Sequence, residues 1–175
     1  KLIGNVASPY TRKMVAYLRY KRIPYEVIWG QPEDILTSMN IEAPKPILLP
    51  VFILDRDGQA TAVTDSTPLI REFEDKYPDR SVLPNNPALN FINFVLEDFG
   101  DEWCTKFMFH YRWHFDEDAD NAGTILPLGI NSNLKDDELA FFKEHFAKRQ
   151  IDRLWVVGSN NDTAEFIENS YKRVL

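Results

Sequence analysis

The sequence predicts a chain in two parts, an α/β half followed by an all-α half. Strand and helix signals alternate from residue 1 to about residue 84, and the signals after residue 87 are mainly helical. Between them stands YPDRSVLPNNP, whose prolines and asparagines are typical of a linker. We therefore expect a first domain over residues 1–80, a linker over 81–87 and a helical domain over 88–175.

The first elements read as a strand, a helix and a strand. LIGNV is a short apolar run, and the segment from Pro9 to Arg22 has apolar residues spaced as on one helix face. YEVIW is rich in β-favouring residues and follows Pro24. A strand, a helix and a strand in succession imply a right-handed parallel crossover. The helix should bury three apolar residues and present its cations to solvent: Met14, Val15 and Leu18 inside; Arg12, Lys13, Arg19 and Lys21 outside.

The rest of the first half predicts a short helix, a β-hairpin and a final helix. EDILTSM predicts a weak, short helix, and PVFIL and ATAVT flank Asp57-Gly58, a strong signal for a hairpin turn. STPLIREFEDKYP predicts a helix with Ser66 as N-cap and Pro68 in its first turn. Its buried stripe should comprise Leu69, Ile70, Phe73 and Tyr77. The order β-α-β-α-β-β-α is that of a thioredoxin-like domain.

The second half is predicted to be all-α. Residues 86–115 form one long, aromatic helical pattern with a possible bend near Gly100, and DEDADNAGTILPLGINSN is interpreted as a break, with DEDAD a solvated loop. KDDELAFFKEHFAKRQIDRL and TAEFIENSYKRVL predict two further helices. The chain starts at Lys1 inside an apolar run and ends without a helix stop signal, so we interpret it as part of a longer protein with an incomplete helical domain.

Composition narrows the classes of partner. A formal net charge of −7 argues against a protein that binds nucleic-acid phosphates. The single cysteine, Cys104, cannot form a disulfide within the chain, which fits a reducing compartment. No run approaches the ~18 consecutive apolar residues of a membrane span. We therefore expect a cytoplasmic protein without a nucleic-acid or membrane partner.

Ser8, in SPYT, stands where the first strand gives way to the helix. A helix N-terminus offers unpaired N–H groups and a partial positive charge, which stabilise an anion such as a thiolate. A hydroxyl at this place can donate a hydrogen bond to a bound thiol and favour its ionised form. Spacing alone favours the plainer interpretation that Ser8 caps the helix, with Pro9 at its first position.

Two later stretches could complete a binding site with Ser8. Pro50, in ILLPVFIL, heads a strand and is a candidate cis-proline, which would free the backbone of Leu49 to pair with an extended peptide. The alternative is a trans proline that begins an edge strand. Asp65 and Ser66 precede a helix, and they either cap it or hold the ammonium and carboxylate of an amino acid.

Together these motifs resemble the glutathione S-transferases. The resemblance rests on SPYT at the first helix, LP before the third strand and DS at the third helix, and it extends over essentially the whole chain. SPYTRK is also similar to the CPYC site of glutaredoxins and the CP-aromatic site of omega-like transferases, with serine at the cysteine position. The resemblance implies the glutathione S-transferase fold, glutathione as co-substrate, a small electrophilic second substrate and a homodimer.

The resemblance also implies residue roles. Ser8 matches the position that contacts the glutathione sulfur, and Tyr10 or Thr11 could share or take over that role. Because position 8 is not a cysteine, the deglutathionylating chemistry of omega-like members is not expected. The protein is then a transferase that conjugates or reduces an electrophile; the alternative is a non-catalytic member used for binding or regulation.

The rest of the glutathione molecule is assigned in the same way. Leu49, before Pro50, matches the residue whose backbone pairs with the cysteinyl part. Asp65 and Ser66 match the pair that holds the γ-glutamyl end. Lys45 lies in the preceding loop and could reach the glycine carboxylate.

Two histidines and the cysteine carry weaker signals. His110 and His114 have the i, i+4 spacing of a helical zinc site, but no cysteine or glutamate motif completes one, so no metal is expected. They should pair with nearby acids or line the cleft between the domains. FMFHYRW is either an aromatic wall for the co-substrate or helix-bundle core, and Cys104 should be a buried thiol.

Overall fold

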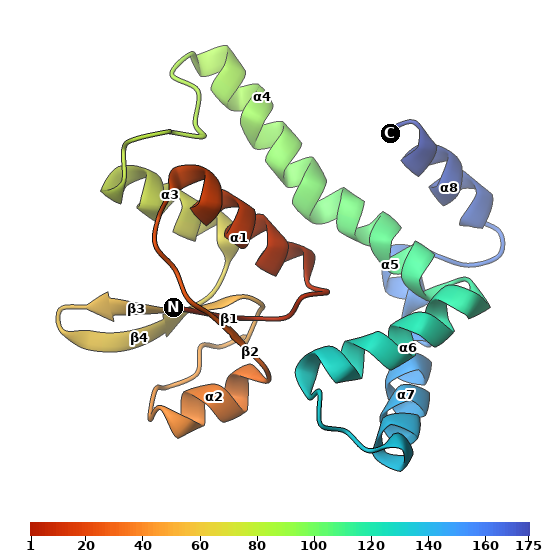
Figure 1. Ribbon diagram of the computed structural model, residues 1–175. Helices are drawn as coiled ribbons and strands as arrows, with labels where there is room; N and C mark the ends of the chain where they lie inside the picture. Colours follow the sequence, from red (N-terminus) through yellow and green to blue (C-terminus); the bar gives the residue numbers. More distant parts are fainter. The chain divides into compact units, whose positions relative to one another are not determined.

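The computed structural model describes all residues from Lys1 to Leu175, and they form two compact units (Figure 1). The first unit comprises Lys1–Pro87 and Gly129–Asn131, and the second comprises Ala88–Leu128 and Ser132–Leu175. The sheet belongs to the first unit, and the second is built from helices. An α/β part thus precedes an all-α part, as the sequence predicts.

The first unit holds a four-stranded sheet with the order β2-β1-β3-β4. Its elements are, in chain order, β1 (Leu2–Gly4), α1 (Pro9–Lys21), β2 (Val27–Trp29), α2 (Pro32–Ser38), β3 (Val51–Arg56), β4 (Gln59–Val63) and α3 (Ser66–Lys76). β1 pairs in parallel with β2 and antiparallel with β3, which itself pairs antiparallel with β4. The predicted order of elements and the parallel first pair are therefore confirmed.

The β3–β4 hairpin forms at the predicted turn. Asp57 and Gly58 have φ values of 54° and 83°, and positive φ at both central residues is what a two-residue hairpin turn of the favoured type requires. The backbone N–H of Gly58 donates to the Asp55 carboxylate over 2.8 Å, which closes the turn.

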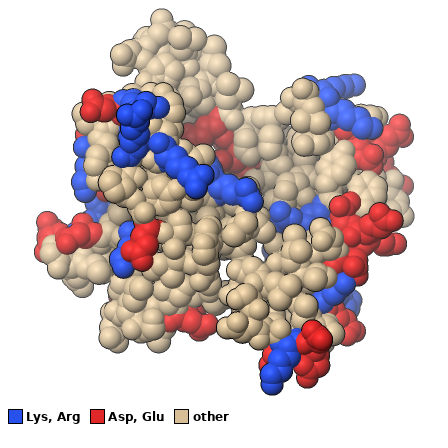
Figure 2. All heavy atoms as spheres, viewed as in Figure 1, with Lys and Arg blue, Asp and Glu red and all other residues tan.

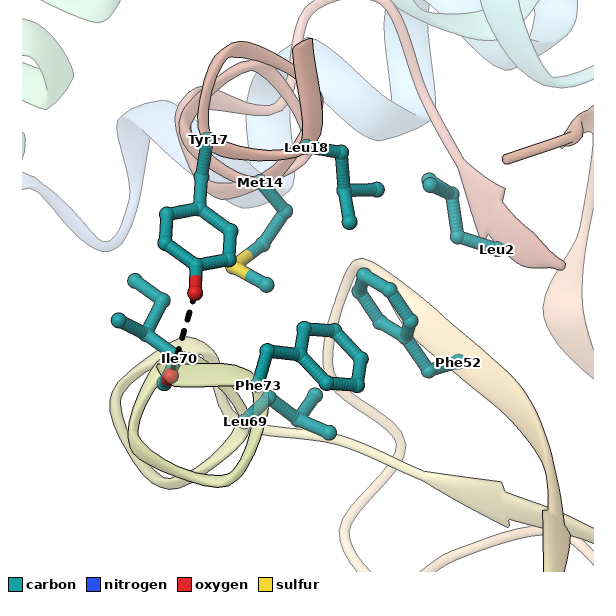
Figure 3. Packing of buried hydrophobic residues seen from close by; sticks show 8 residues of the cluster. All are labelled: Leu2, Met14, Tyr17, Leu18, Phe52, Leu69, Ile70 and Phe73. Atoms are coloured by element: carbon teal, nitrogen blue, oxygen red, sulfur yellow. Dashed lines mark hydrogen bonds between the residues drawn. The ribbon is translucent and has the colours of Figure 1, made fainter. Parts of the chain in front are cut away.

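Each face of the sheet carries a hydrophobic core. The larger core joins β1 and β3 to α1 and α3 (Figure 3) and consists of Leu2, Met14, Tyr17, Leu18, Phe52, Leu69, Ile70 and Phe73. Ile3, Leu36, Val51 and Ala62 form the smaller core. Neighbouring strand residues belong to different cores because side chains alternate along a strand. The predicted helix stripes are confirmed except at Val15, which is only partly buried, and at Tyr77, which ends α3 and is 36% exposed.

Lys21 does not face solvent, contrary to the prediction. Its side chain is fully buried, and its Nζ lies 2.9 Å from Glu74 Oε1 and donates to the Tyr77 carbonyl. Glu74 also accepts hydrogen bonds from the hydroxyls of Tyr17 and Ser81. Burial of a lysine is tolerated when such partners surround it, and the helix pattern alone could not reveal an acid on α3.

The second unit contains five α-helices, α4 to α8. They are α4 (Pro87–Asp98), α5 (Thr105–Trp113), α6 (Asp116–Ile130), α7 (Asp136–Ile151) and α8 (Ala164–Lys172). A π-helical segment, Phe99–Cys104, links α4 to α5 and includes Gly100, near which the sequence suggested a bend. None of the helices combines the length and apolar character that a membrane span requires.

α6 corrects one prediction, because its residues were interpreted as a break with a solvated DEDAD loop. Asp116, Glu117 and Asp118 instead form its first turn, where carboxylates favour the positive end of the helix dipole. Four small or apolar residues recur at helical spacing and are buried: Ala119, Ala122, Gly123 and Leu126. This stripe outweighs the helix-breaking tendency of Pro127, which lies inside the helix.

Candidate functional site

Three chain segments of the first unit meet at one end of the sheet. β1 leads directly into the turn that carries Ser8. Because Ile3 pairs with Val51, Pro50 lies beside the end of β1. β4 runs antiparallel to β3, so the chain that reaches Asp65 leaves the sheet at this same end. The sequence motifs around Ser8, Pro50 and Asp65 are therefore neighbours in space.

Ser8 is the N-cap of α1. It has φ −79° and ψ 121°, and its Oγ accepts a hydrogen bond from the Thr11 N–H over 3.2 Å. A serine hydroxyl has one donor hydrogen besides its acceptor lone pairs, so capping leaves its O–H available to donate. Ser8 is partly exposed, and Tyr10, in the first turn of α1, is partly buried. Capping and contact with a ligand are therefore compatible at Ser8.

The Ser8 turn is held by Asn5, which sequence reasoning missed. The Asn5 side chain accepts from the Ala7 N–H over 2.9 Å, and its carbonyl accepts from the Ser8 N–H over 3.0 Å. Its own N–H donates to the Thr11 hydroxyl over 3.3 Å. An asparagine that bonds the backbone two residues on is a recognisable turn signal. Thr11 is 1% exposed, so of the three candidate hydroxyls it is the one built into the interior.

The peptide bond between Leu49 and Pro50 is cis, the form considered for Pro50 from the sequence. Pro50 is buried and Leu49 partly so, and the strand pairing of β3 begins only at Val51. The Lys45–Pro46 bond is also cis, which the sequence did not suggest. Lys45 itself is exposed, and no hydrogen bond or ion pair joins its side chain to the other candidate residues.

Asp65, rather than Ser66, caps α3. The Asp65 carboxylate accepts from the Thr67 N–H over 3.3 Å, and its φ of 79° lies in the left-handed region. Such a conformation is uncommon for a residue other than glycine and clusters at functional sites. Ser66 is the first residue of the helix and is 7% exposed, so its predicted N-cap role is wrong.

Lys13 joins the site, although the sequence placed it in solvent. Its Nζ donates to the Ser66 hydroxyl over 3.2 Å, and the side chain is partly buried. Basic side chains run along α1 in Figure 2, and Lys13 is the one whose ammonium reaches the start of α3. The sequence could not reveal this role of Lys13, because a contact between residues far apart in the chain leaves no local pattern.

A separate hollow of about 670 Å³ lies at the opposite ends of α1 and α3. Its lining consists of Lys21, Arg22, Ile23, Pro24, Lys76, Tyr77, Pro78, Asp79 and Arg80. Three of its four cations already have partners: Lys21 pairs with Glu74, the Lys76 ammonium lies 5.7 Å from the centre of the Tyr77 ring, and the Arg80 guanidinium lies 4.7 Å from the centre of the Tyr20 ring. Most of the basic lining is therefore engaged within the protein.

In the second unit, His110 is buried among its own partners. Its Nδ1 lies 2.8 Å from Ser159 Oγ and its Nε2 lies 3.9 Å from Glu168. Burial and the neighbouring His114 lower the pKa of His110, and Glu168 opposes them. No group of three or more His, Cys, Asp or Glu side chains is placed to hold a metal ion. Cys104 is only partly buried, less than expected.

Comparison with known families agrees with this geometry. Residues 2–81 match the family model for the glutathione S-transferase N-terminal domain, which spans β1 to α3 and the start of the linker. A search of the curated proteins found no match. Residues 2–81 therefore form a glutathione S-transferase N-terminal domain. The predicted fold class, a thioredoxin-like domain followed by an all-α region as in the glutathione S-transferase fold, is confirmed.

Proposed function

We propose that this protein binds glutathione at the sheet end that carries Ser8, Pro50 and Asp65, and activates its thiol for attack on a small electrophile. The observation that carries the proposal is the state of Ser8. This residue caps α1 through an acceptor lone pair, and its O–H remains able to donate. It lies at the helix N-terminus, where the helix dipole favours an anion. The match of residues 2–81 to the glutathione S-transferase N-terminal domain supports glutathione as the thiol.

In this mechanism the protein favours the ionised thiol and holds it in place. The Ser8 O–H donates to the sulfur and the N-terminus of α1 stabilises its negative charge, so the thiol proton passes to solvent. The thiolate then forms a C–S bond with the electrophile. A leaving group departs with its bonding electrons, or an activated double bond takes up a proton. Tyr10 is proposed to assist Ser8 from the first turn of the helix.

The other parts of glutathione are assigned to the neighbouring segments. The backbone of Leu49, next to Pro50 and outside the strand pairing, is proposed to pair with the cysteinyl part. The Asp65 carboxylate is proposed to bind the ammonium of the γ-glutamyl group, and Ser66 its carboxylate. Lys45 is proposed to bind the glycine carboxylate from its exposed loop.

The proposal is tested by retention on immobilised glutathione followed by conjugation to 1-chloro-2,4-dinitrobenzene. We expect retention and turnover. Ser8→Ala should lower kcat/KM by about 10- to 100-fold, which is what a hydrogen bond to a charged atom contributes. The matched control is Ser170→Ala, which removes a hydroxyl that bonds the Phe166 carbonyl on α8.

The outcomes separate three cases. Failure of the wild-type protein to bind glutathione would refute the proposal altogether. Binding without turnover would favour a non-catalytic member of the family. Full turnover in Ser8→Ala would remove Ser8 from its role and leave Tyr10 as the candidate to test next.

We also propose that the protein is a cytoplasmic homodimer. The support for a dimer is the apolar surface of α4, whose large side chains are exposed in the single chain. The support for a reducing compartment is the single cysteine, Cys104.

A further inference from the structure

Two parallel contacts join α1 to α3 beside the proposed glutathione site. Lys13 donates to the Ser66 hydroxyl, and the Tyr17 hydroxyl, which donates to Glu74, lies 3.4 Å from the Ile70 carbonyl. On each helix the two residues are four positions apart, so they lie on the same helix face. The two contacts between α1 and α3 therefore lie one helical turn apart. The contact made by Lys13 is the one nearer the N-terminus of α3. Its ammonium is therefore fixed by the packing of the two helices.

The contact with Lys13 decides what the Ser66 hydroxyl can do. An ammonium carries only donor hydrogens, so Ser66 Oγ must accept from it. The O–H of Ser66 is then the group left to donate. Ser66 is 7% exposed, so its hydroxyl has little water with which to exchange partners. Lys13 thus biases Ser66 toward donating, and it adds a positive charge beside the hydroxyl.

We propose that Lys13 is a positioning residue for glutathione, which sets the Ser66 hydroxyl as a donor and selects a ligand with a carboxylate at this point. This inference rests on the proposed function and specifies one subsite of it. The carboxylate is the α-carboxylate of the γ-glutamyl group, and Asp65 receives the adjacent ammonium. The γ-glutamyl group thus has both of its charges recognised. Lys13 acts on the carboxylate through Ser66, and Asp65 binds the ammonium directly.

The test compares glutathione with an analogue that lacks only this carboxylate, 4-aminobutanoyl-cysteinyl-glycine. For Lys13→Met we expect KM for glutathione to rise about tenfold while kcat changes less than about twofold, since the contact is made equally in the ground and transition states. KM for the analogue should be unchanged by the substitution. Lys13→Arg, which keeps the charge, should restore most of the preference for glutathione.

Two controls separate positioning from stability. Arg19→Gln removes one positive charge from the far end of α1, and should leave the preference for glutathione over the analogue intact. Lys13→Met combined with Ser66→Ala should cost no more than Ser66→Ala alone, because Lys13 acts through Ser66. Thermal unfolding of each variant shows whether the fold is retained.

Three results would overturn the inference. Equal losses for glutathione and the analogue in Lys13→Met would mean a merely structural role, and so would additive losses in the double variant. An unchanged preference in Lys13→Met, with wild-type binding of glutathione intact, would refute the inference and leave the proposed function standing. Absence of glutathione binding by the wild-type protein would refute both.

Discussion

At Gly4 the backbone of β1 comes into direct contact with the side chain of Thr11. A Cβ added at Gly4 would lie 2.5 Å from Thr11 Cγ2 and 3.0 Å from its Oγ1. Thr11 cannot move easily, because it is 1% exposed and its hydroxyl accepts from the Asn5 N–H. Glycine is thus required here for a close approach between strand and helix. The same approach fixes the turn that presents Ser8.

We predict that Gly4→Ala lowers the free energy of unfolding by about 1–3 kcal/mol, the usual cost of overpacking a tight interior. Urea titration should show the loss as a lower midpoint with an unchanged slope. In the Thr11→Ser background the loss should be smaller, since the nearest clashing atom, the Thr11 methyl, is gone. An equal loss in both backgrounds would contradict the assigned contact.

Sequence reasoning at the residue scale succeeded where a motif is local. Ser8 stands next to Pro9 at a strand-to-helix junction, and Asp65 stands directly before a helix, so both could be found from their neighbours. Lys13 could not, because its partner Ser66 lies on another helix and the pattern of α1 alone assigns it to solvent. The role of each of these residues toward glutathione stays a prediction.

At the scale of elements, Glu74 ties α1, α3 and the following chain together. It pairs with the buried ammonium of Lys21, accepts from the Tyr17 hydroxyl over 2.8 Å, and accepts from the Val82 N–H over 3.2 Å. Burial raises the pKa of Glu74, but hydrogen bonds from Ser81, Lys21 and Tyr17 outweigh it and hold that pKa below its usual 4.5. The charged carboxylate is therefore the form that the fold stabilises.

This gives a stability that depends on pH. A carboxyl group whose pKa is lower in the folded protein stabilises fully above its unfolded pKa, about 4.5, and loses this contribution as the pH falls through the folded pKa. At pH 7, Glu74→Gln should lower the free energy of unfolding by about 3–5 kcal/mol, because it leaves the Lys21 charge buried and unpaired. Below pH 4.5 the difference from the wild type should shrink.

Urea unfolding between pH 7 and pH 3 measures both effects. Glu72→Gln is the matched control, since it removes a carboxylate of α3 that pairs with Arg56 at the surface. Such an exposed pair contributes only about 0–1 kcal/mol. A constant gap between Glu74→Gln and the wild type across this range would show that Glu74 is not ionised in the folded protein.

Elements were predicted well where several signals agreed and poorly where they conflicted. β3 and β4 flank a turn of Asp57 and Gly58, whose positive φ values leave few alternatives. The residues of α6 were interpreted as a break, while its buried positions had helical spacing. Tertiary burial decided in favour of the helix, and burial is what a single sequence does not display.

At the scale of the whole molecule, charge is distributed unevenly. The chain has a net charge of −7, yet basic side chains run along α1 (Figure 2). On an acidic protein, α1 thus offers local positive charge to the anionic glutathione that we propose as its ligand. The total charge, which is all that composition reports, gave no hint of this.

α4 is a largely apolar helix that has no buried residue. Its exposed side chains are Leu89, Phe91, Ile92, Phe94, Val95 and Leu96, with exposures between 46% and 67%. They lie on more than one side of the helix, since residues two positions apart point in nearly opposite directions. A helix face this wide and apolar is normally buried against another surface.

If a second copy of the chain covers α4, the protein should sediment at about twice the 20.4 kDa of one chain. Phe91 is 67% exposed, and Phe91→Lys would place an ammonium in that interface, so we predict that the dimer dissociates at micromolar concentrations. Phe166→Lys is the control, because Phe166 is equally large, is 74% exposed and lies on α8. A monomeric wild-type protein would refute the homodimer. A Phe91→Lys variant that stays dimeric would instead place the interface away from this side of α4.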